Sequence, residues 1–142
     1  MITYEKQPDG SSIVTLTPED FERLYAPREG EKVSRQEALT RALMRSVVAA
    51  YGHADAEDGG TCNFDAPTLK YRDCGISKKA AREAIADAGL RCFEWRVYHD
   101  TELVITGPCF FGQANRRTTM AEAFHAALKA EGYATGMYYQ MD

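Results

Sequence analysis

Apolar residues recur at helical spacing in several stretches of the chain, and the clearest of these is residues 35–51. Ser34 and Glu37 form a capping box at its start, and Gly52 is a typical residue at a helix exit. We therefore expect a helix over 35–51 with one apolar face. That face consists of Ala38, Leu39, Ala42, Leu43, Val47 and Ala50.

The residues before this helix show the pattern of a short hairpin followed by a short helix. Residues 11–16 alternate between apolar and polar, and residues 2–4 can pair with them across a Pro-Asp-Gly turn at 8–10. The threonine and proline at 17–18 are typical of an N-cap and a first helical position, so a helix is expected to run to about Tyr25.

The second part of the chain first shows a strand, a helix and a strand. An irregular strand is expected within 64–71, Ser77 caps a helix that ends at Gly89, and residues 91–98 form the next strand. Alternation within this last strand predicts that Trp95 is buried against the helices. On this interpretation Phe93, Trp95 and Val97 face the helices, and Cys92, Glu94 and Arg96 face the other side.

The same order of elements follows again after a turn at 99–101. Residues 102–106 form a strand, a capping box at 119–122 starts a helix, and residues 133–140 form the last strand. Two such units joined by a hairpin give β-α-β-β-α-β, which is the split βαβ or ferredoxin-like motif.

We thus expect an α+β fold in one domain spanning 1–142. Residues 61–142 would form the ferredoxin-like core, and residues 1–60 would add an amino-terminal hairpin and helices. The apolar face of helix 35–51 needs cover, as does the second face of the sheet, so we expect this helix to pack over the rear or an edge of the sheet.

Length and composition agree with one globular domain. The chain has 142 residues, of which 44% are hydrophobic and 27% are charged. No signal peptide and no membrane-length apolar run is visible, which favours a cytoplasmic location without membrane attachment. The widely spaced Cys62, Cys74, Cys92 and Cys109 therefore favour reduced thiols over disulfides.

The charge distribution places any anion site in the second part of the chain. The net charge is −4, the excess acidic residues lie within 1–60, and 61–142 is neutral. A loop at 107–119 leads into a helix amino terminus, where free N–H groups and two arginines could hold a phosphate or carboxylate. Solvated or locally paired arginines are the alternative. The candidate anion or nucleic-acid ligands are Gln113, Asn115, Arg116, Arg117 and Thr118.

Aromatic residues provide a second candidate surface, at Phe110, Phe111 and Tyr138. Aromatic side chains anchor protein interfaces, and on a ferredoxin-like sheet they also stack on single-stranded bases. The glycine-aromatic motif of RNA-binding domains is absent, so a protein partner is supported at least as well.

No signature of catalysis or of a bound metal is present. His53 lies beside acidic residues without the spacing of a calcium or zinc site, and Cys62 and Cys109 belong to no C-x-x-C pair. His99 and His125 have no evident acid partner or nucleophile. The sequence therefore favours a noncatalytic protein that needs no cofactor and no metal.

Three segments carry a resemblance to a known group: Gly60-Thr-Cys-Asn-Phe-Asp65, Gly112-Gln-Ala-Asn-Arg-Arg117 and Tyr138-Tyr-Gln-Met-Asp142. Over about 60–142 the chain resembles uncharacterised small proteins of Firmicutes plasmids, phages and integrated conjugative elements. The resemblance implies a mobile-element accessory protein that binds a macromolecular partner, such as a regulator or an inhibitor of a host defence (CRISPR) nuclease. The alternative is a nucleic-acid or phosphate-ligand binding protein that uses the Arg116/Arg117 loop.

Overall fold

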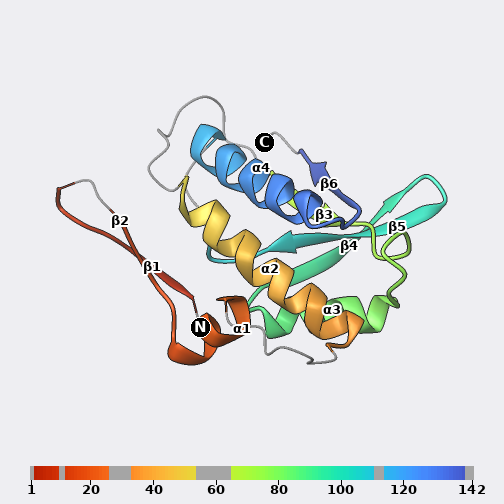
Figure 1. Ribbon diagram of the computed structural model, residues 1–142. Helices are drawn as coiled ribbons and strands as arrows, with labels where there is room; N and C mark the ends of the chain where they lie inside the picture. The colour runs from red at the N-terminus through yellow and green to blue at the C-terminus, as the bar shows by residue number, and fades with distance from the viewer. Residues whose placement is uncertain (1, 10–11, 26–32, 54–64, 111–113, 140–142) are drawn as a thin grey trace.

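The computed structural model describes residues 2–9, 12–25, 33–53, 65–110 and 114–139, and within these ranges the chain is a mixed α+β structure (Figure 1). The described ranges contain four helices and two antiparallel sheets. The elements are β1 (Thr3–Lys6), β2 (Ser12–Thr15), α1 (Pro18–Tyr25), α2 (Arg35–Tyr51), β3 (Ala66–Leu69), α3 (Lys78–Asp87), β4 (Arg91–Val97), β5 (Asp100–Thr106), α4 (Ala114–Ala130) and β6 (Thr135–Tyr138).

Local sequence signals explain where the first three helices begin. The Thr17 hydroxyl accepts from the Asp20 amide at 3.1 Å, the Ser34 hydroxyl accepts from the Glu37 amide at 3.1 Å, and Ser77 caps α3 in the same way. The predicted helix over 35–51 is confirmed. The predicted hairpin is also confirmed, because β1 pairs antiparallel with β2.

The predicted start of α4 is wrong. The helix begins at Ala114 instead of near Thr119, so the expected capping box at 119–122 lies inside the helix. Alanine and arginine are good helix formers and carry the helix upstream through Ala114 and Arg116. Thr118 is accommodated in the helix because its hydroxyl donates to a carboxylate oxygen of Asp65 instead of competing with the helix backbone.

Four strands form the larger sheet, in the order β4-β5-β3-β6, and every neighbouring pair is antiparallel. The strands β4 and β5 form a hairpin in which Val97 pairs with Asp100. Tyr98, in the turn between them, has a positive φ of 56°. β3 lies between β5 and β6, so β4 and β6 are the two edge strands.

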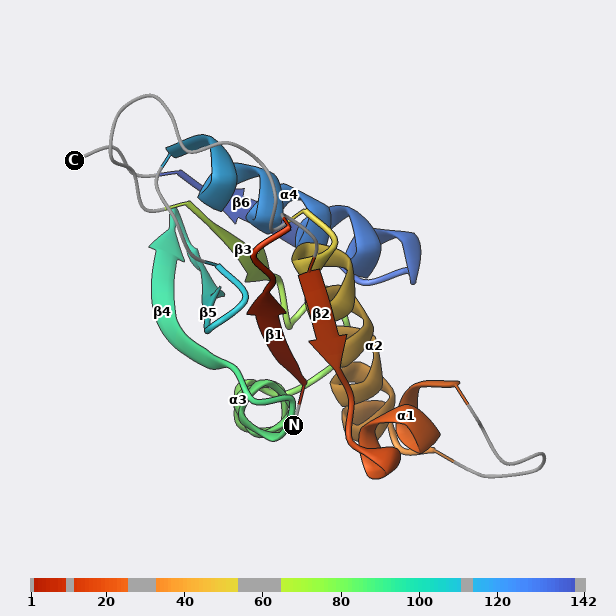
Figure 2. The same cartoon turned by 90° about the vertical axis from the view of Figure 1, so that its left-hand side faces the viewer.

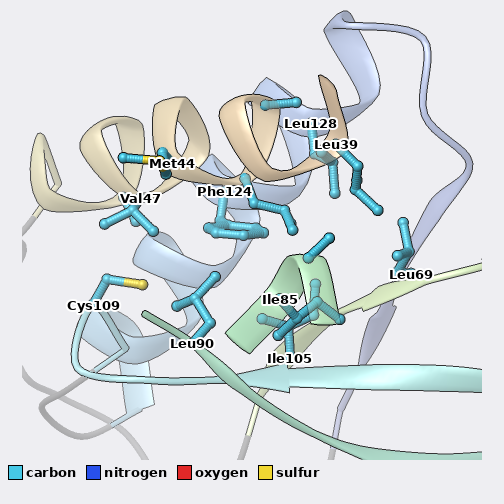
Figure 3. Close-up of a cluster of buried hydrophobic side chains, with 14 of the residues drawn as sticks. Leu39, Met44, Val47, Leu69, Ile85, Leu90, Ile105, Cys109, Phe124 and Leu128 are labelled. Atoms are coloured by element: carbon cyan, nitrogen blue, oxygen red, sulfur yellow. The ribbon is translucent and has the colours of Figure 1, made fainter. Parts of the chain in front are cut away.

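Helices α2, α3 and α4 lie on one side of this sheet (Figures 1 and 2). The expectation that α2 covers the sheet's rear or an edge is wrong, because α2 packs against α3 and α4 on the helix side. The apolar side chains of the three helices form one core, as Figure 3 shows for Leu39 of α2, Ile85 of α3 and Phe124 of α4. Among the helices of the described ranges, none combines the length and apolar character needed to cross a membrane.

The predicted orientation of β4 is also wrong. Cys92 is paired with the buried Ile105 and packs against the core, and Glu94 meets Lys78 of α3, so these side chains face the helices. Phe93 and Trp95 therefore point to the other face. Each face of β4 carries both polar and apolar side chains, so the sequence pattern alone does not determine which face is turned to the helices.

Candidate functional site

Residues of the predicted anion loop form a partly buried cluster with Asp65. We call it the Asp65–Arg117 cluster and define it as Asp65, Phe110, Arg117 and Thr118. The Arg117 Nε donates to the carbonyl oxygen of Asp65 at 3.2 Å, and its Nη1 donates to the carbonyl oxygen of Phe110 at 3.2 Å. The hydroxyl of Thr118 donates to Oδ2 of Asp65, which is itself 1% exposed. The start of α4 is thereby fastened to the segments that precede β3 and follow β5.

Arg117 thus directs its guanidinium inward, toward protein carbonyl groups. Burial lowers the pKa of Arg117, and the nearby Asp65 carboxyl partly opposes this shift. Arg116 is half-buried in the first turns of α4. Of the other predicted anion ligands, Gln113 lies outside the described residues, and so does the side chain of Asn115.

Two aromatic residues of the predicted partner surface, Phe110 and Phe111, adjoin each other in this part of the sequence. Phe110 is buried, and its ring packs edge-on against that of Phe124 with centroids 5.2 Å apart. It is therefore a core residue, whereas Phe111 lies outside the described residues. Cys109 is also fully buried, beside Val47 and Leu90 in Figure 3, and burial raises the pKa of its thiol far above the usual range.

His125 contacts a hydroxyl group in a geometry that does not support nucleophilic catalysis. Its Nδ1 lies 3.2 Å from Oγ1 of Thr135, but that hydroxyl donates its proton to the carbonyl oxygen of Thr68 at 2.6 Å. His125 must therefore donate to Thr135 instead of accepting a proton from it. Burial, with a smaller contribution from Lys129, lowers the pKa of His125.

Metal ligands do not gather in the part of the chain that the structure describes. No group of three or more His, Cys, Asp or Glu side chains is close enough together to hold an ion. Cys74, Cys92 and Cys109 are free thiols. Cys62 lies outside the described residues.

A different surface brings exposed aromatic rings together on the sheet face opposite the helices. We call it the aromatic rear face and define it as Phe93, Trp95 and Tyr138. The Tyr138 ring meets Trp95 edge-on with centroids 4.9 Å apart and Phe93 edge-on at 6.0 Å. Phe93 is 39% exposed, and Trp95 and Tyr138 are half-buried. No helix of the described ranges covers these rings (Figure 2).

The three rings span the whole width of the sheet. Tyr138 is on β6 and its two partners are on β4, although β5 and β3 lie between these strands. The registers place Val104 and Thr68 on this face, and both are fully buried. The rings therefore cover the side chains of the two middle strands on this face.

A buried polar pair, Thr68 and Glu102, lies on the same face of the sheet as the rings. The Thr68 hydroxyl donates to Oε1 of Glu102 at 2.8 Å, and Glu102 is 8% exposed. Gly136 lies opposite Thr68 on β6, and a Cβ added there would come within 2.9 Å of the Thr68 hydroxyl oxygen. A side chain at position 136 would therefore displace the Thr68 hydroxyl, so glycine is needed there for this pair to form.

Sequence reasoning found only one residue of this surface. Tyr138 was a candidate partner residue, whereas Phe93 and Trp95 were expected to be in the core. The signal that could have found them is the polar sequence of α3, whose Lys78 and Arg82 need a carboxylate such as Glu94 facing them.

Comparisons with protein-family models, with curated proteins and with solved structures found no match for this chain.

Proposed function

We propose that this chain is a noncatalytic protein that binds a protein partner through the aromatic rear face. The observation that carries the proposal is the exposure of Phe93 beside Trp95 and Tyr138 on a sheet face that no described helix covers. Partly exposed aromatic side chains held in place by their neighbours are typical anchors of protein interfaces.

The charges around the aromatic rear face favour a protein over nucleic acid. Nucleic-acid binding requires several cations that neutralise phosphates. On this face the exposed cations Arg91 and Lys70 are accompanied by the half-buried carboxylate of Asp100, so the surface is mixed. Arg117, the best cation of the predicted anion site, is directed at two protein carbonyl groups.

The supporting fold is, we infer, of the ferredoxin-like split βαβ type from β3 to β6. Element order β-α-β-β-α-β, an entirely antiparallel sheet and strand order β4-β5-β3-β6 support this inference. The resemblance to mobile-element proteins suggests a host defence nuclease as the class of partner, and such a nuclease is therefore one arm of the test.

The chain carries its own reporter for this test, because Trp95 is its single tryptophan. The experiment follows Trp95 emission while the chain is titrated with a CRISPR nuclease, with single-stranded DNA or with duplex DNA, each at low and moderate salt. A protein partner should move the emission to the blue as Trp95 is dehydrated, whereas binding of DNA should weaken steeply as salt rises.

The matched variants are Phe93→Ser, which alters the aromatic rear face, and Tyr98→Ser, which removes a ring that is 92% exposed in the β4-β5 turn. Phe93→Ser should weaken partner binding roughly tenfold or more, as expected for an interface anchor, whereas Tyr98→Ser should leave it unchanged. Saturable, salt-sensitive binding of DNA without binding of any protein would contradict the proposal and favour the nucleic-acid alternative.

A further inference from the structure

Strand β4 is an edge of the larger sheet and is paired on one side only within the described residues. It spans Arg91–Val97 and pairs with β5 along its full length. An edge strand presents backbone N–H and C=O groups that can pair with a strand of another chain. This is the backbone half of peptide recognition by strand addition.

A cavity lies alongside this edge strand, between β4 and α3. Its volume is about 310 Å3, and its lining residues are Arg82, Ile85, Ala86, Leu90, Arg91 and Cys92. Ile85 and Leu90 are buried and form an apolar floor, whereas Ala86 is exposed and too small to close the entrance. A groove beside an edge strand is where alternate side chains of an added strand find pockets.

The border between β4 and α3 is positively charged, in contrast to the acidic chain as a whole. The carboxylate of Glu94 lies at this border and is shared by Lys78 at 2.9 Å and Arg82 at 3.4 Å. Arg91 and Arg96 are exposed, and neither forms an ion pair with a described residue. The border therefore has an excess of cations facing solvent, which complements an acidic ligand.

We propose that β4 and α3 form a docking groove for an extended acidic segment of the partner, which adds to β4 as a further strand. The inference deepens the proposed function and rests on it. Successive side chains of the added strand would point to opposite faces of the sheet. One set would lie beside Phe93 and Trp95, and the other would lie beside Arg82 and Arg96. The occupant is thus a protein segment in which apolar and acidic residues alternate.

The experiment uses the full chain and a synthetic ten-residue peptide that alternates valine and glutamate, blocked at both ends and labelled with a fluorophore. Binding is measured by the anisotropy of the label and by the emission of Trp95. The wild-type chain should bind this peptide. A peptide with lysine in place of glutamate and a peptide of the same composition in non-alternating order should bind at least roughly tenfold more weakly.

Two perturbations separate charge from backbone pairing. Arg96→Glu should weaken binding of the acidic peptide by roughly tenfold or more, whereas the exposed control Lys129→Glu on α4 should change it less than about twofold. A peptide N-methylated at alternate residues cannot donate to β4 and should not bind, and this test leaves the protein unaltered.

Two results would overturn the docking groove: no binding of the alternating peptide at low salt, or binding that survives both the charge reversal and N-methylation. Neither result removes the proposed function, because partner binding that is lost in Phe93→Ser and retained in Tyr98→Ser would still stand. Conversely, if the alternating peptide binds but Phe93→Ser does not change partner binding, the docking groove is retained and the aromatic rear face is excluded as the partner surface.

Discussion

The Asp65–Arg117 cluster and the aromatic rear face use their most interactive side chains in opposite ways. In the cluster, Arg117 is directed inward to two carbonyl oxygens, and Thr118 is directed to a carboxylate that is almost fully buried. On the rear face, Phe93 keeps 39% of its surface exposed. The first region therefore stabilises the fold, and the second is the surface that we propose binds a partner.

This comparison predicts that loss of Arg117 affects stability more than loss of any ring on the rear face. Arg117→Ala removes two hydrogen bonds from a charged donor and leaves two carbonyl oxygens without them. We expect the free energy of unfolding to fall by about 2 kcal/mol, as measured by chemical denaturation. Partner binding should be unchanged once the comparison is made under conditions where the variant is folded.

Arg117→Lys is the control for charge. A single ammonium group retains the charge but lacks the fork that reaches both carbonyl oxygens, so this variant should lose nearly as much stability as Arg117→Ala. Full stability in the lysine variant would show that position 117 contributes charge alone, which would support the predicted anion site.

A smaller loss of stability is expected on the rear face. Trp95→Ala removes one edge-on contact with Tyr138 and the burial of a half-exposed ring, so unfolding should become easier by about 1.5 kcal/mol. A fully buried tryptophan would cost about 3 to 5 kcal/mol. A loss in that higher range, measured by the same denaturation, would show that Trp95 belongs to the core and would contradict the comparison.

The orientation of Trp95 shows where prediction from the sequence succeeds and where it fails. Caps and helix exits are local, so Ser34, Ser77 and Gly89 predict α2 and α3 closely. The face that β4 turns to the helices depends on Glu94 finding Lys78 and Arg82, which is a tertiary contact between separate elements. A strand with side chains of both kinds on both faces can adopt either orientation, and a one-residue change of register exchanges them.

The surroundings of Arg117 could not be predicted for a related reason. A pair of arginines before an expected helix can hold an anion or pair locally, but α4 begins earlier and places Arg117 within reach of Asp65 and Phe110. Asp65 is 52 positions away in the chain, so no local pattern marks this contact. The single residue of the rear face that sequence reasoning did identify, Tyr138, lies at the end of the last strand.

The smallest expected effect concerns the thiols, and it tests how well the Asp65–Arg117 cluster closes the core beside it. Burial raises the pKa of Cys74, of Cys92 and, most strongly, of Cys109. Raising the pH should therefore allow iodoacetamide to modify Cys74 and Cys92 before Cys109, as followed by mass spectrometry of the native protein. Arg117→Ala should speed modification of Cys109 alone among these three, because it loosens the adjoining segment.

Photocrosslinking tests the role of the aromatic rear face most directly. Benzoylphenylalanine is placed at position 93 in one preparation and at position 98 in another, and both are irradiated in the presence of the CRISPR nuclease and of DNA. Both positions are exposed, but only position 93 lies on the aromatic rear face. We predict a covalent adduct with protein from position 93 and none from position 98. Equal adducts from both positions, or an adduct with DNA alone, would contradict the account.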